Sequence, residues 1–334
     1  MTPSRVAVLA GGRSSEHEVS IASGASVADG LRVAGHEVVE ITIGRDGVWR
    51  RDGDKVTITL GARLPDVDVV FPVLHGPFGE DGTVQGLLEC LDMPYVGAGV
   101  LASALCMDKI LFKRLMAQVG IPQVDYRGLR ATDYATDPAA VSRVVAELGY
   151  PLFIKPARLG SSVGIARVAG PEELAAALDG AFAHDSLLIA EALATGREIE
   201  CSVMGNDDPI ASQPGEILLA AGEGAWYDYE AKYTPGGMEL SVPARLEEPV
   251  SDRVRALAVQ AFTAAGCVGL ARADFFVLPG GDVLVNELNT MPGFTQTSVF
   301  GSLFAASGIP YPELLDRLVL LAVERHAAER ALRH

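Results

Sequence analysis

The feature that most constrains this chain is a Gly-Gly pair at residues 280 and 281, which separates two runs of alternating apolar and polar side chains. A glycine pair in that setting is a strong signal for a β-hairpin. A turn centred on this pair places Asp274 opposite Glu287 on the neighbouring strand. Arg272 then lies opposite Asn289, so that all four side chains share one face. Opposed carboxylates, with Cβ atoms about 4.5–5.5 Å apart, repel each other unless a cation lies between them.

These four side chains form a candidate metal site. Mg²⁺ takes oxygen ligands, often one or two carboxylates, and completes its shell with substrate phosphates and water. The alternative is a solvated hairpin face on which Arg272 bridges the two acids, and the hairpin alone does not decide between them. The opposite face is expected to pack into the core, and it carries Ala273, Phe275 and Val277 on the first strand and Leu284, Asn286 and Leu288 on the second.

The length and charge of the chain limit the classes of protein it can belong to. A chain of 334 residues predicts two or three packed units. The net charge of −16 and the pI near 4.8 argue against nucleic-acid and anionic-membrane partners, because both favour basic surfaces. The four cysteines, Cys90, Cys106, Cys201 and Cys267, form no CxxC pair, which indicates thiols in a reducing compartment. With no signal or membrane-spanning segment apparent, we expect a cytoplasmic protein.

Residues 5–96 alternate between strand and helix patterns. Strands are expected at 5–10, 37–43 and 67–74, and helices at 20–34 and 82–91. This alternation predicts a parallel sheet that binds ligands beyond the carboxyl ends of its strands. The loops 11–18 and 75–82 each follow one of these strands, so both should face the same crevice.

After residue 105 the pattern changes. A helix at 107–119 is expected to open a new unit, and residues 133–138 read as a surface loop. Short strands are expected at 152–155, 164–168, 187–190 and 198–203, and residues 314–323 have helical spacing. In the fourth strand Ile199, Cys201 and Val203 alternate with Glu198, Glu200 and Ser202, which is typical of an antiparallel strand with one solvated face.

The nucleotide-binding signals differ in strength. There is no GxxxxGK[ST] motif, and residues 97–102 match GxGxxA without a suitably placed acidic residue, which disfavours a hydride-transferring enzyme. Residues 155–164 are a better candidate, because a strand brings Lys155 to a loop of glycine and serine whose N–H groups can bind phosphate. An ordinary turn with a surface lysine is the alternative. Residues 225–233 combine aromatic and charged side chains as a lid would, although an anchored surface loop has the same composition.

Five motifs, taken in order, resemble the D-alanine:D-alanine ligases of the ATP-grasp superfamily. They are residues 11–20, His75-Gly76 with 79–82, 160–164, 227–233 and 286–295. The resemblance implies an α/β protein, α+β in its nucleotide-binding part. A parallel-sheet N-terminal domain (1–105) would be followed by an ATP-grasp fold of two subdomains (106–195 and 196–334). It also implies that ATP phosphorylates one D-alanine, whose acylphosphate the amine of a second D-alanine attacks, giving a dipeptide for peptidoglycan.

The resemblance assigns roles by position. Asp274, Glu287 and Asn289 would bind two Mg²⁺ ions, with Mn²⁺ as a possible substitute. ATP would contact Lys109, Lys155, Gly160, Ser161, Ser162, Val163, Gly164, Glu191, Glu198 and Lys232. D-alanine would be bound by Glu16, His75 and Ser298, while Arg272 and the N–H of Gly293 would stabilise the oxyanion. Glu16, Ser161 and Tyr233 would form a hydrogen-bonded set that closes the site, and a homodimer is expected.

The predicted lid bears on the second substrate. Similar ligases that form the ester with D-lactate tend to carry histidine in a lid of different composition. The resemblance of residues 227–233, Tyr-Asp-Tyr-Glu-Ala-Lys-Tyr, therefore implies an amino acceptor rather than D-lactate. A D-alanine:D-serine ligase and a non-catalytic nucleotide-binding regulator remain alternatives. The chain departs from the family at 192–194, where Ala-Leu-Ala is smaller than the segment usual beside adenine, and at the alanines flanking Arg272.

Overall fold

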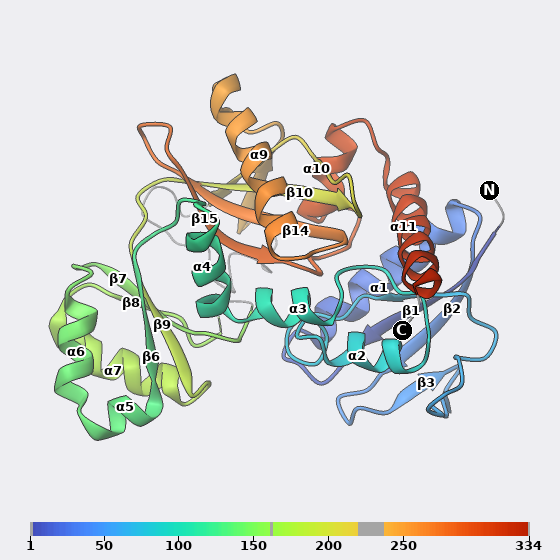
Figure 1. The fold of residues 1–334 in the computed structure, drawn as a ribbon, viewed down its shortest axis with the longest axis horizontal. Coiled ribbons are helices and arrows are strands. Elements are labelled where there is room, and N and C mark those ends of the chain that lie inside the picture. Colours follow the sequence, from blue (N-terminus) through green and yellow to red (C-terminus); the bar gives the residue numbers. More distant parts are fainter. Residues whose placement is uncertain (1–2, 161–162, 220–236, 333–334) are drawn as a thin grey trace.

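The computed structural model describes residues 3–160, 163–219 and 237–332. Three sheets follow one another along the chain: a five-stranded sheet, a four-stranded sheet and a six-stranded sheet. The six-stranded sheet lies between the other two in Figure 1, so the molecule is elongated. The predicted mixture of α and β structure is therefore confirmed. The residues 161–162, 220–236 and the termini lie outside the description.

The first sheet is mainly parallel where the sequence predicted it. Its order is β4-β3-β2-β1-β5, formed by β1 (Arg5–Gly11), β2 (Glu37–Ile43), β3 (Trp49–Arg51), β4 (Asp54–Lys55) and β5 (Val69–Pro72). The strand β1 pairs in parallel with both β2 and β5, whereas β3 and β4 add an antiparallel edge that the sequence analysis did not predict. Helices α1 (His17–Val33) and α2 (Thr83–Cys90) follow the two predicted loops.

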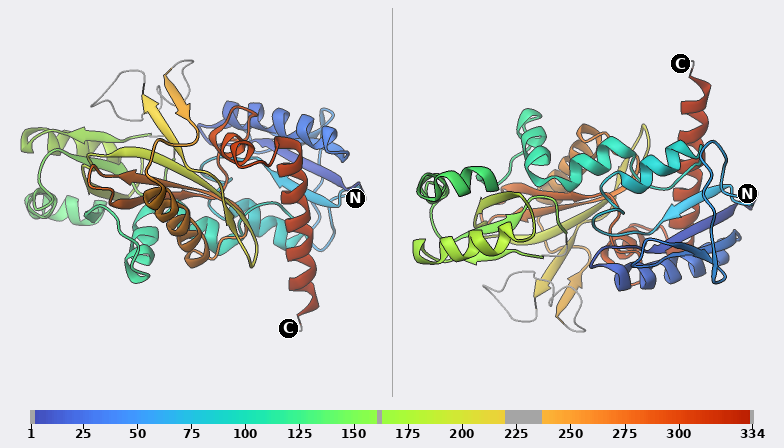
Figure 2. Two further views of the ribbon diagram at one scale, coloured as in Figure 1. Left: turned by 90° about the horizontal axis from the view of Figure 1, so that it is seen from above. Right: turned by 90° about the horizontal axis from the view of Figure 1, so that it is seen from below.

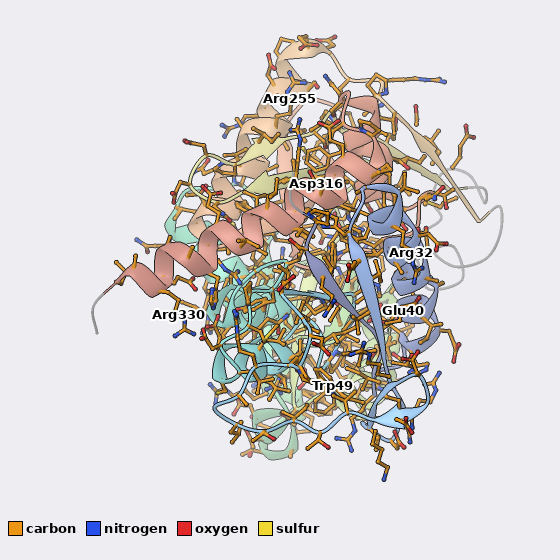
Figure 3. The ribbon with its side chains drawn as sticks, turned by 90° about the vertical axis from the view of Figure 1, so that its right-hand side faces the viewer. Arg32, Glu40, Trp49, Arg255, Asp316 and Arg330 are labelled. Atoms are coloured by element: carbon orange, nitrogen blue, oxygen red, sulfur yellow. The ribbon has the colours of Figure 1, made fainter. Side chains whose placement is uncertain are left out.

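The last helix of the chain completes the core of this first sheet. Helix α11 (Tyr311–Ala331) packs against α1 and β5. Figures 2 and 3 show this long helix at the C-terminal end of the chain beside the N-terminal part of the fold. The apolar side of α11 packs against the sheet in a cluster that includes Val6, Leu31, Phe71, Leu315 and Leu318. Asp316 on this helix binds the ring of buried His36, with 3.1 Å between Oδ1 and Nε2. The end of the chain is thus packed on its beginning.

The four-stranded sheet is antiparallel, with β6 (Tyr126–Arg130), β9 (Leu187–Ala192), β7 (Leu152–Pro156) and β8 (Ala166–Val168) in that order. Helices α6 (Pro138–Ala146) and α7 (Pro171–Phe182) share an apolar core with one face of the sheet. On the other face, Ile110 packs against Ile189 and Ala157. Ile110 belongs to α4 (Lys109–Gln118), so this helix is held close to the sheet.

The helix expected at 107–119 is confirmed as α4, which begins two residues later because Asp108 adopts an extended conformation and caps it. Oδ1 of Asp108 accepts the N–H groups of Ile110 and Leu111 at 3.0 Å. The helix before it, α3 (Val100–Met107), was not predicted.

The loop expected at 133–138 is wrong, because these residues form helix α5 (Ala131–Thr136) and the start of α6. The Asp137 side chain caps α6 by accepting the N–H of Ala140. Pro138 follows as the first helical residue, a position that suits proline.

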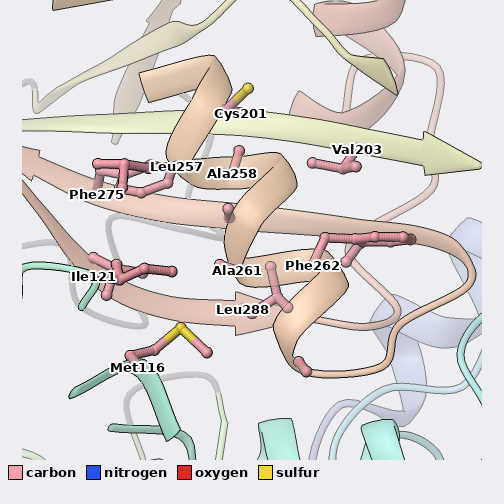
Figure 4. Packing of buried hydrophobic residues seen from close by; sticks show 14 of the residues in the cluster. Met116, Ile121, Cys201, Val203, Leu257, Ala258, Ala261, Phe262, Phe275 and Leu288 are labelled. Carbon is pink, nitrogen blue, oxygen red and sulfur yellow. The ribbon is translucent and has the colours of Figure 1, made fainter. Parts of the chain in front are cut away.

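The six-stranded sheet is antiparallel and contains β10 (Arg197–Gly205), β11 (Ile210–Ala211), β12 (Gly215–Leu219), β13 (Met238–Ser241), β14 (Gly269–Val277) and β15 (Val283–Asn289). Helix α9 (Glu248–Ala264) covers one face, where Leu257 and Phe262 pack against Phe275 and Leu288 (Figure 4). Helix α10 (Val299–Ala306) packs near β10 on the other side.

The predicted solvated face of β10 is not solvated. Glu200 and Ser202 are buried, although they alternate with apolar residues as expected. The Ser202 hydroxyl donates to the carbonyl of Phe300 at 3.4 Å, because α10 covers this part of the strand. The polar residues of β10 therefore face the interior of a site and a helix contact rather than water.

The hairpin has the predicted register at its polar end. Asp274 pairs with Glu287 and Arg272 with Asn289. Nearer the turn, Phe275 pairs with Val285 rather than with Asn286, so Asn286 is an extra residue in β15. This bulge changes the prediction for the core face: Val283 and Val285 are buried there, and Leu284 and Asn286 are not. One inserted residue in a strand moves the side chains beyond it to the opposite face of the sheet.

No helix in the described part of the chain combines the length and the apolar character needed to cross a membrane.

Candidate active site

A cavity of about 1880 Å³ is lined by loops of the first sheet and by strands of the other two. Most of the predicted site residues that the structure describes line it: Glu16, His75, Lys109, Lys155, Gly160, Glu191, Glu198, Arg272, Asp274, Glu287, Asn289, Gly293 and Ser298. Typical ligand pockets measure roughly 300–1,000 Å³. The cavity therefore has room for a nucleotide together with smaller substrates.

The polar end of the hairpin is a network of opposite charges. Arg272 donates from Nε and Nη2 to the two carboxylate oxygens of Asp274, each at 2.7 Å. Its Nε also lies 2.9 Å from Oε2 of Glu200 on the neighbouring strand β10. Across the hairpin, Oε2 of Glu287 lies 3.6 Å from Nζ of Lys109. Each carboxylate is thus held by a positive group in a partly buried position.

The donor atoms at this end fit a hard divalent cation. Asp274 and Glu287 supply carboxylates on adjacent strands, and Asn289 supplies an amide next to Asp274, with Nδ2 2.9 Å from Oδ2. A rotation of the Asn289 amide by about 180° would bring its oxygen, in place of its nitrogen, toward a metal ion. Within the described residues, no three or more His, Cys, Asp and Glu side chains are grouped so as to hold a metal by themselves. An ion here would need the Asn289 oxygen and phosphate oxygens to complete its shell.

Glu191 and two lysines form a second charged group. Its Oε2 lies 2.5 Å from Nζ of Lys155, and its Oε1 lies 2.8 Å from Nζ of Lys113. Burial alone would raise the pKa of Glu191, but the two ammonium groups outweigh it and hold that pKa well below its ordinary value. Burial lowers the pKa of Lys155, and the carboxylate of Glu191 more than restores it. The Glu191 side chain is therefore engaged by lysines.

The glycine-rich loop begins beside the charged end of the hairpin. Nζ of Lys109 donates to the carbonyl of Leu159 at 2.8 Å, just ahead of Gly160. A Cβ on Gly160 would lie 3.3 Å from Oε2 of Glu16, so this loop approaches the first sheet. Gly164 has a φ of +70°, which glycine adopts readily. The predicted site residues Ser161, Ser162, Lys232 and Tyr233 lie outside the described part of the chain; Val163 is the first described residue after the gap.

The two loops of the first sheet meet, as the sequence predicted. Ser14 donates to the carbonyl of His75 at 2.7 Å, and the N–H of Glu16 donates to the Ser14 hydroxyl at 3.2 Å. Glu16 and His75 are both buried. Nδ1 of His75 lies 3.0 Å from the carbonyl of Met291, which ties these loops to the segment after β15. Burial lowers the pKa of His75 and so favours the neutral ring.

The segment after β15 carries the remaining predicted residues. The Ser298 hydroxyl accepts the N–H of Thr295 at 2.9 Å and lies 2.7 Å from the Thr295 hydroxyl. A Cβ on Gly293 would lie 3.2 Å from the Ser298 oxygen, so a side chain there would crowd the hydroxyl. Gly293 and Ser298 are thus neighbours at one end of the cavity.

Three charged residues of this region were missed by the sequence analysis. Glu80 accepts the N–H of Gly76 at 2.6 Å, and burial together with nearby Glu16 raises the pKa of Glu80 to about 8. The alternation along β10 predicts a solvated Glu200, which is buried. Lys113 follows Lys109 by one helical turn and therefore shares its side of α4, a spacing that could have indicated it.

The GxGxxA match at 97–102 has a packing role. A Cβ on Gly269 would lie 3.1 Å from the nitrogen of Gly97, so two backbones come close at this point. The carbonyl of Gly97 accepts a hydrogen bond from Nη1 of Arg325 at 2.7 Å. These contacts explain Gly97 without a dinucleotide.

Comparisons with known proteins agree with this geometry. The family model described as D-ala D-ala ligase N-terminus matches residues 5–63 and 50–98, and the model described as D-ala D-ala ligase C-terminus matches 115–320. A D-alanine–D-alanine ligase from Deinococcus radiodurans is 47% identical, with 96% of this chain and 98% of the relative covered. One from Paenarthrobacter aurescens is 44% identical, with 98% and 97% covered.

Solved structures show the same likeness. The D-alanine–D-alanine ligase from Coxiella burnetii has a TM-score of 0.88 at 36% identity, covering 99% of this chain and 97% of that one. The VanG D-Ala:D-Ser ligase from Enterococcus faecalis has a TM-score of 0.86 at 35% identity, covering 96% and 100%. The chain therefore belongs to the D-alanine–D-alanine ligase family and has its ATP-grasp fold.

Proposed function

We propose that this enzyme joins two molecules of D-alanine to D-alanyl-D-alanine at the expense of ATP, through a D-alanyl phosphate, and so supplies a precursor of peptidoglycan. Membership of the family makes the chain an ATP-dependent ligase. The observation that carries the assignment of the reaction centre is the network of Arg272, Asp274 and Glu287 at one end of a cavity that also contains Glu16 and His75. The positive groups there can bind phosphate and carboxylate, and the negative groups can bind a metal ion and an ammonium group.

The family uses ATP with a divalent metal, and we assign the metal to the hairpin. Asp274, Glu287 and Asn289 would hold Mg²⁺, with two ions as the expected number and Mn²⁺ as a substitute. Bound there, the metal would neutralise charge on the transferred phosphoryl group. The carboxylates are on neighbouring strands with a fixed register, which supports this assignment.

The nucleotide would lie along the lysines. Lys109 and Lys155 come from different elements and both line the cavity, so they can contact phosphate from two sides. The loop from Gly160 to Gly164 would close over the phosphates with its N–H groups. Glu198 would lie near the adenosine, whereas the Glu191 carboxylate is already bound by two lysines and would contribute there only through its main chain.

The reaction then follows from charge and position. The carboxylate of the first D-alanine attacks the γ-phosphorus of ATP, which forms the acylphosphate and releases ADP. The neutral amine of the second D-alanine attacks the acyl carbon, and the tetrahedral oxyanion expels inorganic phosphate. Glu16 would bind the ammonium of the first D-alanine beside His75, and Ser298 would bind the carboxylate of the second. Arg272 and the N–H of Gly293 would stabilise the oxyanion.

The proposal also covers the division of the chain into domains, its oligomeric state and its location. We divide the chain into units 1–105, 106–195 and 196–334, each of which contains one of the three sheets. We also expect a homodimer in the cytoplasm, with no nucleic-acid or membrane partner.

Product analysis tests the identity of the second substrate. The solved structures that resemble this chain include both a D-alanine–D-alanine ligase and a D-Ala:D-Ser ligase, so the fold does not separate the acceptors. The predicted lid and its Tyr233 lie outside the described residues. ADP release should be measured with D-alanine alone and with D-serine or D-lactate added, and products identified by mass. D-alanyl-D-alanine as the main product supports the proposal, and a mixed product as the main one contradicts it.

A further inference from the structure

Lys113 is the most deeply buried charged side chain near the cavity. Its side chain is 1% exposed, and lysine is rarely buried to this extent unless it is paired. Lys155 and Glu191 line the cavity, while Lys113 lies behind them on α4. A lysine that cannot reach a ligand must act through the residues in front of it.

Those residues are brought together by the register of the four-stranded sheet. Glu191 on β9 pairs with Tyr126 on β6 and with Phe153 on β7. Lys155 follows Phe153 by two residues and so lies on the same face. Lys113 reaches this face from α4, and its ammonium lies 5.9 Å from the centre of the Tyr126 ring. The arrangement places one carboxylate between two ammonium groups.

The charges in this group do not cancel. Glu191 carries one negative charge, and Lys113 and Lys155 carry one positive charge each, at 2.8 and 2.5 Å from its two oxygens. These three residues therefore have a net charge of +1, and Glu287 and Glu198, which also act on Lys155, do so less strongly than Glu191. Without Lys113 the remaining pair would be neutral, and the carboxylate would hold Lys155 alone. In a partly dehydrated cavity, one unit of charge has a large effect on a polyphosphate.

We infer that Lys113 is a positioning residue for nucleotide binding: it occupies one oxygen of Glu191, so that Lys155 keeps an excess positive charge for the phosphates of ATP. The inference rests on the proposed function and adds a residue to it. A purely structural reason for Lys113 is weaker. Lys155 could satisfy Glu191 alone, and a buried ion pair stabilises a fold no better, in many cases, than an apolar residue of the same size.

The test compares polyphosphate with nucleoside. Lys113→Met shortens the unbranched side chain by one atom and removes its charge. We expect the Kd of ATP and of ADP, measured by calorimetry on the full-length protein, to rise about ten- to thirtyfold, the size expected for one unit of charge about 8–12 Å from the phosphates at an effective dielectric constant near 20. Adenosine, which has no phosphate, should keep its Kd. Lys113→Arg should retain most ATP affinity, and Lys55→Met on the edge strand β4 is the matched control, with no change expected.

A second variant separates charge from packing. In Lys113→Met with Glu191→Gln, the negative charge is removed as well, so Lys155 regains its excess charge and ATP affinity should recover to within about threefold of the wild type. The inference is overturned if Lys113→Met weakens adenosine and ATP equally, or if the double variant binds ATP no better than the single one. Ligation is assayed separately: a wild-type protein that binds ATP through these lysines without joining D-alanine contradicts the proposed function and leaves this inference standing.

Discussion

Arg272 and Asp274 bind one another through two hydrogen bonds of 2.7 Å on the same face of strand β14. The residues are two positions apart, so their side chains point in the same direction. A planar guanidinium fits a carboxylate in this two-pronged manner, and an ammonium does not. The proposed oxyanion-stabilising group is thus held in place by a proposed metal ligand.

Replacing Arg272 with lysine tests this arrangement. An ammonium at this position would keep the charge but could not form the two parallel hydrogen bonds to Asp274. We therefore expect Arg272→Lys to reduce kcat by about 10²–10³-fold, the range for loss of one oxyanion donor. The KM for ATP should change little. Steady-state ADP release measures both. Arg158→Lys is the control, because Arg158 also binds an aspartate, Asp185, through two nitrogens but does not line the cavity. An equal loss in both variants would contradict the role.

The metal assignment predicts a changed requirement for Mg²⁺. Glu287→Gln removes one charge without changing the shape of the side chain, so the Mg²⁺ concentration for half-maximal activity should rise at least about tenfold. The measurement is ADP release over a range of Mg²⁺ at saturating ATP. Asp282→Asn, at an exposed position in the same hairpin, should have no effect. An unchanged Mg²⁺ dependence in Glu287→Gln would rule out Glu287 as a ligand.

The sequence predicts which residues pair in the hairpin better than which side chains of β15 are buried. The hairpin and the pairing of Asp274 with Glu287 are confirmed. The turn itself is centred on Gly280 rather than between the two glycines, because Val277 pairs with Val283, and the bulge restores the predicted pairing at the polar end. The bulge at Asn286 could not be predicted, since a single inserted residue leaves no distinct pattern in the alternation. The alternation along β10 also could not reveal that Glu200 is buried, because its burial depends on segments that are distant in the sequence. The types of side chain at the site were predictable, and their surroundings were not.

Two helical glycines provide a matched test of the packing that positions the Glu16 loop. A Cβ on Gly24 of α1 would lie 2.5 Å from the Cβ of Ala10, whereas a Cβ on Gly180 of α7 would have nothing within 4 Å. Alanine favours a helix over glycine by about 0.8–1.0 kcal/mol. We therefore expect Gly180→Ala to stabilise the protein by roughly that amount, and Gly24→Ala to destabilise it. Chemical denaturation measures both, and stabilisation by Gly24→Ala would contradict the close α1–β1 contact.

Glu80 gives the fold a dependence on pH. Burial raises the pKa of Glu80 to about 8, above its value in the unfolded chain, so the folded state holds the proton more tightly. Stability should consequently fall as the pH rises from the unfolded pKa, near 4.5, toward 8. Glu80→Gln cannot lose a proton and should show a smaller fall. Denaturation curves between these two pH values test the sign, and identical pH dependence in both proteins would exclude Glu80 as the cause.

The most direct test of the whole account follows one oxygen atom. If the carboxylate of D-alanine is phosphorylated and the amine then attacks its carbon, the bond between that carbon and the bridging oxygen breaks, and the oxygen leaves with phosphate. D-alanine labelled with ¹⁸O in its carboxylate should therefore yield one ¹⁸O in each inorganic phosphate, together with ADP and D-alanyl-D-alanine, as measured by mass spectrometry. Unlabelled phosphate, or ATP hydrolysis that does not depend on D-alanine, would contradict the account.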